Sequence, residues 1–527
     1  MDTSEAPQPV LDDRSGISTS DSCRNFVRNS ASNLVLAVFS AATSLYMVPF
    51  LIANLGVANY GMVTLANSFV LYTEVFTAAI FGTVFRFASV HIARGEYDEA
   101  QGYFNTQLVF IAWFVRALIP LAAAVSVLAP RMINIPSGQT ANTQLLLFLI
   151  YVSFALSVIS SPFRLGTFVK QRFDISNLIE IGNQVLRYST WILLFALAAP
   201  KTWHVGIGYI LGSLGFAFAH YIAFRIFVPQ LKLRLGSFDK TKFLQMARTG
   251  IWMTLGQVGA VLYLSADLLI INRTLGPESV GLYSPVLGLS MMLRGVSGMM
   301  TGLMLPVSVS CYAQRDWGKL IRGACSASKL MSLGMAIPAG IICGLSRPFL
   351  TTWLGPEFGP LYPLVWLMLV HQVFNAGVEP LFGVNLAANK VAVPGVATVV
   401  GGVLKVVLSV ILAVFTPLGL YGVAIGTLIS FVLKNLMFIP YYEGIVLKTS
   451  SRPFYMALVP SFVLFAASAG LSALATRIVN LDTLLHVFAA GAITGLVCAL
   501  LGYMILCDRE EKQLMRRMMP WLRANPE

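Results

Sequence analysis

Charged residues are scarce in this sequence. Asp, Glu, Lys and Arg together make up 11% of its 527 residues, whereas an ordinary soluble protein is about 25% charged. Apolar residues account for 57%, and the mean hydropathy is +0.75. The lack of charge excludes an ordinary soluble domain. It predicts an all-α polytopic membrane protein, because helices satisfy their own backbone hydrogen bonds in lipid.

Residue patterns for metal binding, ATP hydrolysis or secretion are also missing. The six cysteines lie mostly in or beside apolar runs, without the spacing of metal ligands. The P-loop motif GxxxxGK[ST] does not occur, and no polar segment is long enough to form a nucleotide-binding domain. Residues 1–30 contain no apolar run, which predicts a disordered cytoplasmic tail instead of a cleavable signal peptide. We therefore expect no metal site, no cofactor other than a coupling Na⁺ or H⁺, and no enzymatic activity.

What the sequence does contain is a series of long apolar runs. A helix of about twenty apolar residues crosses a hydrocarbon core of roughly 30 Å, and about fourteen runs reach this length. They lie near 34–53, 62–90, 107–129, 143–163, 177–199, 205–228, 249–272, 280–308, 326–346, 361–386, 393–416, 419–441, 454–476 and 483–506. The runs predict two sets of six helices followed by an appended helix pair.

The chain is accordingly divided into five expected parts. They are a tail at 1–30, an N-terminal six-helix bundle at 31–230, a C-terminal six-helix bundle at 231–448, the appended pair at 449–507 and a C-terminal tail at 508–527.

The formal charge is +13, and the Lys and Arg residues gather in short segments between the apolar runs. They form no basic stripe with interleaved aromatic residues, so nucleic acid is not an expected partner. Of the 36 basic residues, 25 fall on the side of the N-terminus, six fall within the expected helices, and five fall on the opposite side. Because basic residues concentrate in cytoplasmic segments, this asymmetry predicts that both termini are cytoplasmic.

A short turn occurs twice in the chain. IANLGVANYG at 52–61 is echoed by NRTLGPESVG at 272–281, and both lie between two apolar runs. At a separation of 220 the glycines coincide, and at 218 Pro162 coincides with Pro380 and Arg187 with Lys405. Each half contains an even number of expected crossings, so the halves are predicted to have the same orientation and to be related by an axis along the membrane normal.

Several glycine-rich motifs resemble those of a known family. LGVANYG follows the first run, RGEYDEA follows the second, and NLAANKVAVPG leads to PLGLYGVAIGTLIS. Over about residues 25–445 the chain resembles the polysaccharide-transporter (O-antigen flippase) branch of the multidrug/oligosaccharidyl-lipid/polysaccharide exporter superfamily. The resemblance implies a carrier that moves an undecaprenyl-pyrophosphate-linked oligosaccharide to the periplasmic leaflet of a bacterial inner membrane. It also implies polysaccharide polymerase and glycosyltransferases as partners.

Ten charged residues lie inside the expected helices, where each charge costs about 2.5–3.5 kcal/mol unless water or an opposite charge meets it. Arg86 and Lys434 are expected to extend toward the headgroups from near the cytoplasmic ends of their helices. Four others lie closer to the middle, and they are predicted either to bind an anionic substrate in a central cleft or to form structural ion pairs. These four are Arg116, Arg187, Arg294 and Lys405.

Arg187 and Lys405 are equivalent residues in the repeat, so they are expected to line the cleft at similar depth. Glu74 and Arg294 are also equivalent but opposite in charge, which predicts a gating pair across the two halves.

Five residues are candidates for ion coupling or gating. His371, Asn375 and Glu379 are spaced four residues apart, which stacks them on one helix face, and they suggest a cation or proton site. Asp267 is a further candidate, and Glu74 belongs to this group through its expected pairing with Arg294. The alternative is that the polar stripe simply lines a helix interface.

Other functions stay open at this point. An ion-coupled exporter of small organic cations would share the fold, but it would favour acidic and aromatic residues, whereas six basic and four acidic residues lie within the expected helices. A flippase for the peptidoglycan lipid precursor fits equally well. A membrane-embedded enzyme is disfavoured, because the expected external loops, such as RPFLTTWLGPEFGP, have only about a dozen residues.

Overall fold

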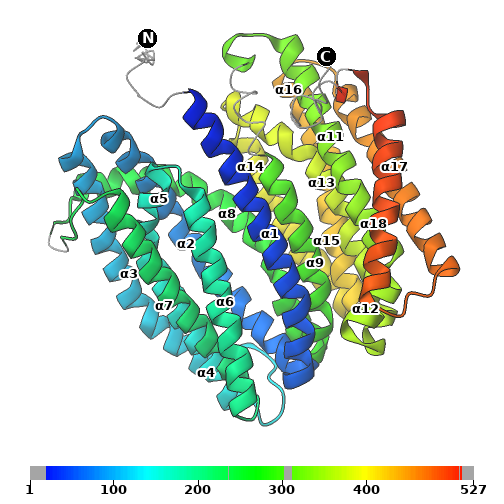
Figure 1. Cartoon of the computed structure of the whole chain (residues 1–527), viewed down its shortest axis with the longest axis horizontal. Helices are drawn as coiled ribbons and strands as arrows, with labels where there is room; N and C mark the ends of the chain where they lie inside the picture. The colour runs from blue at the N-terminus through cyan, green and yellow to red at the C-terminus, as the bar shows by residue number, and fades with distance from the viewer. Residues whose placement is uncertain (1–18, 235–236, 302–310, 510, 513–527) are drawn as a thin grey trace.

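The computed structural model describes residues 19–234, 237–301, 311–509 and 511–512, and every element in these ranges is helical. The N-terminal half contains α1 (Thr19–Leu55), α2 (Val57–Ala93), α3 (Tyr97–Met132), α4 (Thr140–Ser160), the 3₁₀ turn η1 (Ser161–Arg164), α5 (Leu165–Val169), α6 (Phe173–Leu197) and α7 (Thr202–Phe227). In Figure 1 these helices form one side of the molecule.

The C-terminal half contains α8 (Lys240–Leu275), α9 (Pro277–Thr301), α11 (Trp317–Gly344), α12 (Ser346–Leu354), the 3₁₀ turn η2 (Pro356–Leu361), α13 (Tyr362–Ala387), α14 (Ala392–Val414), α15 (Leu420–Phe431), the π-helix η3 (Val432–Phe438) and α16 (Ile439–Val446). The appended pair is α17 (Arg452–Ile478) and α18 (Leu484–Leu501), which ends in the π-turn η4 (Gly502–Leu506). The start of α1 and the last described residues lie at the same end of the molecule (Figure 1).

The all-helical membrane architecture is confirmed, but the expected number of about fourteen crossings is not. Helices occupy each of the fourteen expected ranges as far as the structure describes them. Within the described residues, eleven helices are long and apolar enough to cross a membrane, and α2, α6 and α9 are not among them. Residues 302–310, the end of the expected run at 280–308, lie outside the described residues.

The repeated turns pack against each other at the end of the molecule opposite to the start of α1. Gly61 approaches Gly281 so closely that a Cβ atom on Gly61 would lie 2.7 Å from the Gly281 nitrogen, and one on Gly281 would clash with the Val57 carbonyl. Gly56 and Gly276 precede these contacts with φ angles of 81° and 89°, a conformation that favours glycine. The glycines of the repeat therefore serve both the turn and the close approach of the two halves.

Two polar contacts extend this approach. Thr64 Oγ1 lies 2.7 Å from Ser284 Oγ, and these residues are 220 apart in the chain. Equivalent residues of the two halves therefore touch each other, as expected near an axis that relates the halves. Nearby, the Asn134 backbone N–H donates to Asn272 Oδ1 at 2.7 Å, and Asn272 Nδ2 donates to the Asn134 backbone carbonyl at 2.9 Å. We call the Gly61–Gly281, Thr64–Ser284 and Asn134–Asn272 contacts the hairpin clasp.

One segment expected to be a loop is helical. Most of RPFLTTWLGPEFGP forms α12 and η2, because Phe349, Leu350 and Trp353 share one buried face of α12. The Trp353 indole N–H donates to the Leu45 carbonyl in α1 at 2.7 Å. That carbonyl lacks its usual helical partner, because Pro49, four residues later, has no N–H. The α12 segment thus ties the C-terminal half to α1.

Candidate functional site

A polar cavity of about 650 Å³ lies between α2, α4, α6, α8 and α9. Its charged lining residues are Glu74, Arg164 and Glu180, and Ser161, Asn183 and Gln257 add uncharged polar groups. On α2 the cavity begins at Ser68, one helical turn beyond the clasp residue Thr64. The clasp therefore closes one end of the space between the halves, and the cavity lies on the other side of it.

Arg164 is the one cation among the described residues that line this cavity. It directly follows the apolar run expected near 143–163, so it was expected in the connection to the next helix and not at the cavity. It ends the 3₁₀ turn η1, which interrupts the helix after α4 at Pro162. Its side chain is exposed and lines the cavity together with Glu74, and Arg164 is the cation whose charge acts on the Glu74 carboxyl. Pro162 was the sequence feature that could have predicted this position. A proline that breaks a helix inside an apolar run leaves a polar turn at membrane depth.

An apolar groove of about 650 Å³ separates α1 from α9. Leu34, Val38 and Val48 line it from α1, and Leu289 and Met292 line it from α9. Met291 lines both the groove and the polar cavity. The two spaces therefore adjoin at this residue, so that a polar compartment and an apolar one meet between the halves.

Arg187 is enclosed by aromatic rings and is not among the residues that line the cavity. Its guanidinium carbon lies 4.8 Å from the centre of the Tyr188 ring, 4.9 Å from Tyr209 and 5.7 Å from Trp191. One guanidinium nitrogen also donates to the Tyr188 hydroxyl at 3.1 Å. Asn183 on the same helix does line the cavity, so Arg187 lies one turn beyond the cavity wall.

Lys405 forms a fully buried ion pair with Asp267. The Lys405 ammonium lies 2.7 Å from Asp267 Oδ1, and the two side chains are 0% and 2% exposed. The ammonium also donates to the Tyr263 carbonyl, and the Tyr283 hydroxyl donates to Asp267 Oδ2 at 3.1 Å. The structure therefore brings one predicted substrate residue and one predicted coupling residue together. It does not place Lys405 at a cleft surface or in an aromatic enclosure like that of Arg187.

His371 and Asn375 share one face of α13, as the spacing predicts. Asn375 Nδ2 lies 3.0 Å from His371 Nδ1, and the Asn375 carbonyl oxygen accepts from Asn435 at 2.8 Å. All three side chains are buried, and the His371 ring stacks on Phe431 with centroids 4.6 Å apart. This chain of polar groups links α13 to η3.

The remaining candidates are Glu74, Arg294, Glu379 and Arg116. No ion pair joins Glu74 to Arg294, so the expected gating pair is not formed in this conformation. Arg294 is partly buried on α9, and the carboxylate that acts on it is Glu379. Arg116 is exposed on α3 and is not among the cavity residues.

Comparison with known sequences identifies a family. The model of a family described as polysaccharide biosynthesis protein matches residues 26–311. "Uncharacterized membrane protein EpsK" of Bacillus subtilis (strain 168) is 30% identical over 492 residues, which cover 93% of this chain and 97% of that protein.

Comparison with solved structures identifies the fold. An inward-facing multidrug resistance MATE family transporter of the MOP superfamily matches with a TM-score of 0.63 at 15% identity, covering 81% of this chain and 99% of its own. Lipid II flippase MurJ in an inward closed conformation matches with a TM-score of 0.63 at 14% identity, covering 91% and 99%. An outward-facing MATE structure gives 0.54 at 14% identity, covering 81% and 97%. The chain shares the fold of these structures, whose names describe two transporters and a flippase.

Proposed function

Because the chain belongs to the polysaccharide biosynthesis protein family, we propose that it is a flippase for an undecaprenyl-pyrophosphate-linked oligosaccharide used in cell-surface polysaccharide synthesis. It acts in a bacterial inner membrane with both termini in the cytoplasm, and the distribution of basic residues supports this orientation. Glycosyltransferases that build the lipid-linked sugar and a polymerase that consumes it are its expected partners.

The observation that carries this proposal is the junction of the polar cavity with the apolar groove at Met291. A lipid-linked sugar has a polar head and a long hydrocarbon tail, so it needs both compartments at once. In this arrangement the head occupies the cavity and the tail leaves between α1 and α9 toward the bilayer. A small soluble organic cation has no hydrocarbon tail that would occupy the groove.

Arg164 is the residue that we assign to the phosphate. A pyrophosphate must leave the headgroup region to enter the cavity, and an arginine guanidinium offers it a planar pair of donors. Glu74 lines the same cavity as Arg164, so its carboxylate and the substrate phosphate would compete for the Arg164 charge. Arg294, three residues beyond Met291 on α9 and offset by Glu379, provides a second cation near the junction.

Transport then requires the hairpin clasp to open while the opposite end of the cavity closes. Substrate shifts this equilibrium only if it contacts the two states differently, and a phosphate that reaches Arg164 in only one state would be such a difference. A coupling Na⁺ or H⁺ would act on the His371–Asn375 chain, because the Asp267 carboxylate is already engaged by Lys405.

Replacement of Arg164 tests the phosphate assignment. We expect Arg164→Ala to lower transport at least tenfold, and Arg164→Lys to restore it only in part, because a point charge replaces a paired donor. Transport is measured as lipid-linked sugar that becomes accessible at the periplasmic leaflet, with the amount of membrane protein measured alongside. Lys170→Ala is the matched control, because Lys170 lies six residues away and does not line the cavity.

Three outcomes separate the candidate functions. Full transport by Arg164→Ala would show that Arg164 does not bind the substrate phosphate. Transport of the peptidoglycan lipid precursor in preference to the polysaccharide intermediate would make the chain a peptidoglycan flippase. Export of a small organic cation with no movement of either lipid would make it an ion-coupled exporter.

A further inference from the structure

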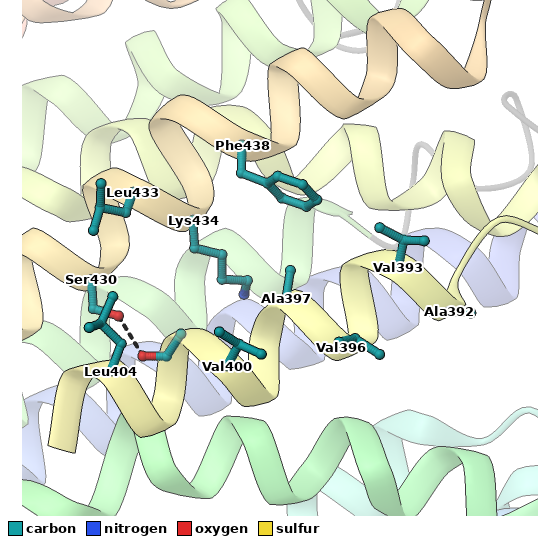
Figure 2. Close-up of a pocket in the computed structure, with 11 residues that line it drawn as sticks. Ala392, Val393, Val396, Ala397, Val400, Leu404, Ser430, Leu433, Lys434 and Phe438 are labelled. Carbon is teal, nitrogen blue, oxygen red and sulfur yellow. Dashed lines mark hydrogen bonds between the residues drawn. The ribbon is translucent and has the colours of Figure 1, made fainter. Parts of the chain in front are cut away.

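A second apolar groove, of about 490 Å³, lies between α14 and the segment formed by the end of α15 and η3 (Figure 2). Val393, Val396 and Val400 form one wall, and Leu433 and Phe438 form the other. The three valines are 46%, 63% and 60% exposed, so the groove opens to the surroundings of the protein. It shares no lining residue with the central cavity or with the groove between α1 and α9.

A lysine lies inside this apolar groove. Lys434 extends from η3 into the space between the two helices, toward Ala397 (Figure 2). Its ammonium lies 5.2 Å from the centre of the Tyr263 ring and 5.5 Å from that of Phe382. The residue is part of a π-helix, a rare conformation that is frequent at functional sites.

No carboxylate of the described residues forms an ion pair with Lys434. By contrast, Lys405 in the same half has Asp267 as its partner. Two aromatic faces stabilise an ammonium only modestly, so the groove presents a cation that its own residues do not neutralise.

The depth of Lys434 follows from the pairing of the two helices. The Ser430 hydroxyl donates to the Gly401 carbonyl at 2.6 Å, the bond drawn in Figure 2. Four residues further along η3, Lys434 is therefore level with Ala397, five residues from the start of α14. At 1.5 Å per residue this is about 8 Å from the helix end. A lysine side chain at this depth reaches toward the headgroup region of the leaflet that borders the start of α14.

We propose that this groove is a binding site for one anionic phosphoglycerolipid, with a hydrocarbon chain along the valine wall and the phosphate against Lys434. An apolar trough with a single uncompensated ammonium complements a lipid of this kind. The transported lipid is a poorer match, because its sugar has no polar lining here. The site is independent of the transport pathway proposed above, so its test does not depend on transport.

Lipid retention by the purified full-length protein tests the site. The probes are phosphatidylglycerol and phosphatidylethanolamine with identical acyl chains, and bound lipid is counted by native mass spectrometry. We expect the wild type to retain phosphatidylglycerol in preference. Lys434→Met should lower its retention about fivefold, the factor that corresponds to about 1 kcal/mol per basic residue near anionic lipid. Lys434→Arg should keep most of it.

A second set of variants tests the site by placing a large side chain in the groove. Ala397→Phe should displace both lipids, whereas Val407→Phe should not, because Val407 is exposed on the same helix but does not line the groove. Gel filtration and thermal unfolding establish that each variant is folded. Equal retention of phosphatidylglycerol by folded Lys434→Met would overturn the proposal. So would displacement of phosphatidylglycerol from the wild type by one equivalent of a polyprenyl pyrophosphate, which would assign the groove to the transported lipid.

Discussion

At the scale of single residues, the buried Lys405–Asp267 pair shows how a charge is kept inside an apolar bundle. Lys405 contributes its ammonium from α14, and Asp267 and the Tyr263 carbonyl receive it from α8. Tyr283 completes the site from α9 by donating to the second carboxylate oxygen. The Lys405 ammonium thus occupies the place beside the Asp267 carboxylate where a bound cation would otherwise lie. Three helices are joined by this one cluster.

The pair predicts a thermodynamic cycle. Lys405→Met or Asp267→Asn alone should lower the free energy of unfolding by about 3–5 kcal/mol, because each change leaves one charge buried without its partner. The double variant should recover most of this loss, since neither charge remains. Thermal unfolding in detergent measures the cycle, with Lys201→Met as an exposed control. If the loss in the double variant equals the sum of the two single losses, the two residues do not act as a pair.

At the scale of secondary structure, prolines and glycines determine where helices break and where they touch. Pro49 releases the Leu45 carbonyl to Trp353 of α12. Pro162 lies in the 3₁₀ turn that carries Arg164 into the cavity. Gly61 and Gly281 allow α2 and α9 to approach without side chains between them. Each of these residues changes the backbone locally, and its effect appears in a contact between elements.

The hairpin clasp predicts that a cross-link will stop transport. In a background without the six native cysteines, Thr64→Cys together with Ser284→Cys should form a disulfide. The hydroxyl oxygens that the sulfur atoms replace are 2.7 Å apart, and an S–S bond of about 2.05 Å needs neighbouring side chains. Transport should fall below a tenth of the uncross-linked value and return after reduction. Transport that persists at complete cross-linking would mean that the clasp does not open during the cycle.

At the scale of the whole molecule, the two halves of the repeat touch each other at the equivalent residues Thr64 and Ser284. The polar cavity draws its lining from both halves, but its charged residues come from the N-terminal half. The buried ion pair and the His371–Asn375 chain lie in the C-terminal half. The repeat therefore preserved the fold while the two halves acquired different polar interiors.

The orientation of the molecule can be measured by cysteine labelling in intact cells. Asn54→Cys, exposed near the clasp, should react with a membrane-impermeant maleimide added from outside. Lys390→Cys, exposed in the turn before α14, should react only after the membrane is permeabilised. The expectation follows from the excess of basic residues on the side of Lys390. The reverse pattern would place both termini outside the cytoplasm.

Much of the fold follows from local sequence properties. Apolar runs of membrane length specify helices regardless of their neighbours, because an unpaired backbone group is too costly in lipid. The repeated LG-x₄-G turns specify the two halves, and the spacing of His371 and Asn375 specifies their shared face. The segment at 347–360 was expected to be a loop, because its helical form depends on burial of Trp353 and its neighbours against other elements.

The partners of the charged residues were decided by tertiary structure. The sequence showed that Arg187 and Lys405 carry charges that are costly in a membrane and that they occupy equivalent positions of the repeat. Helix packing surrounds Arg187 with aromatic rings and pairs Lys405 with Asp267. Equivalence in a repeat fixes backbone position, whereas the neighbours of a side chain come from helices whose sequences have diverged. Arg164 reaches the cavity for the same reason, because only the packing around its turn determines which space it faces. The sequence by itself determined that charges in the membrane need compensation, and the packed helices determined which group compensates each one.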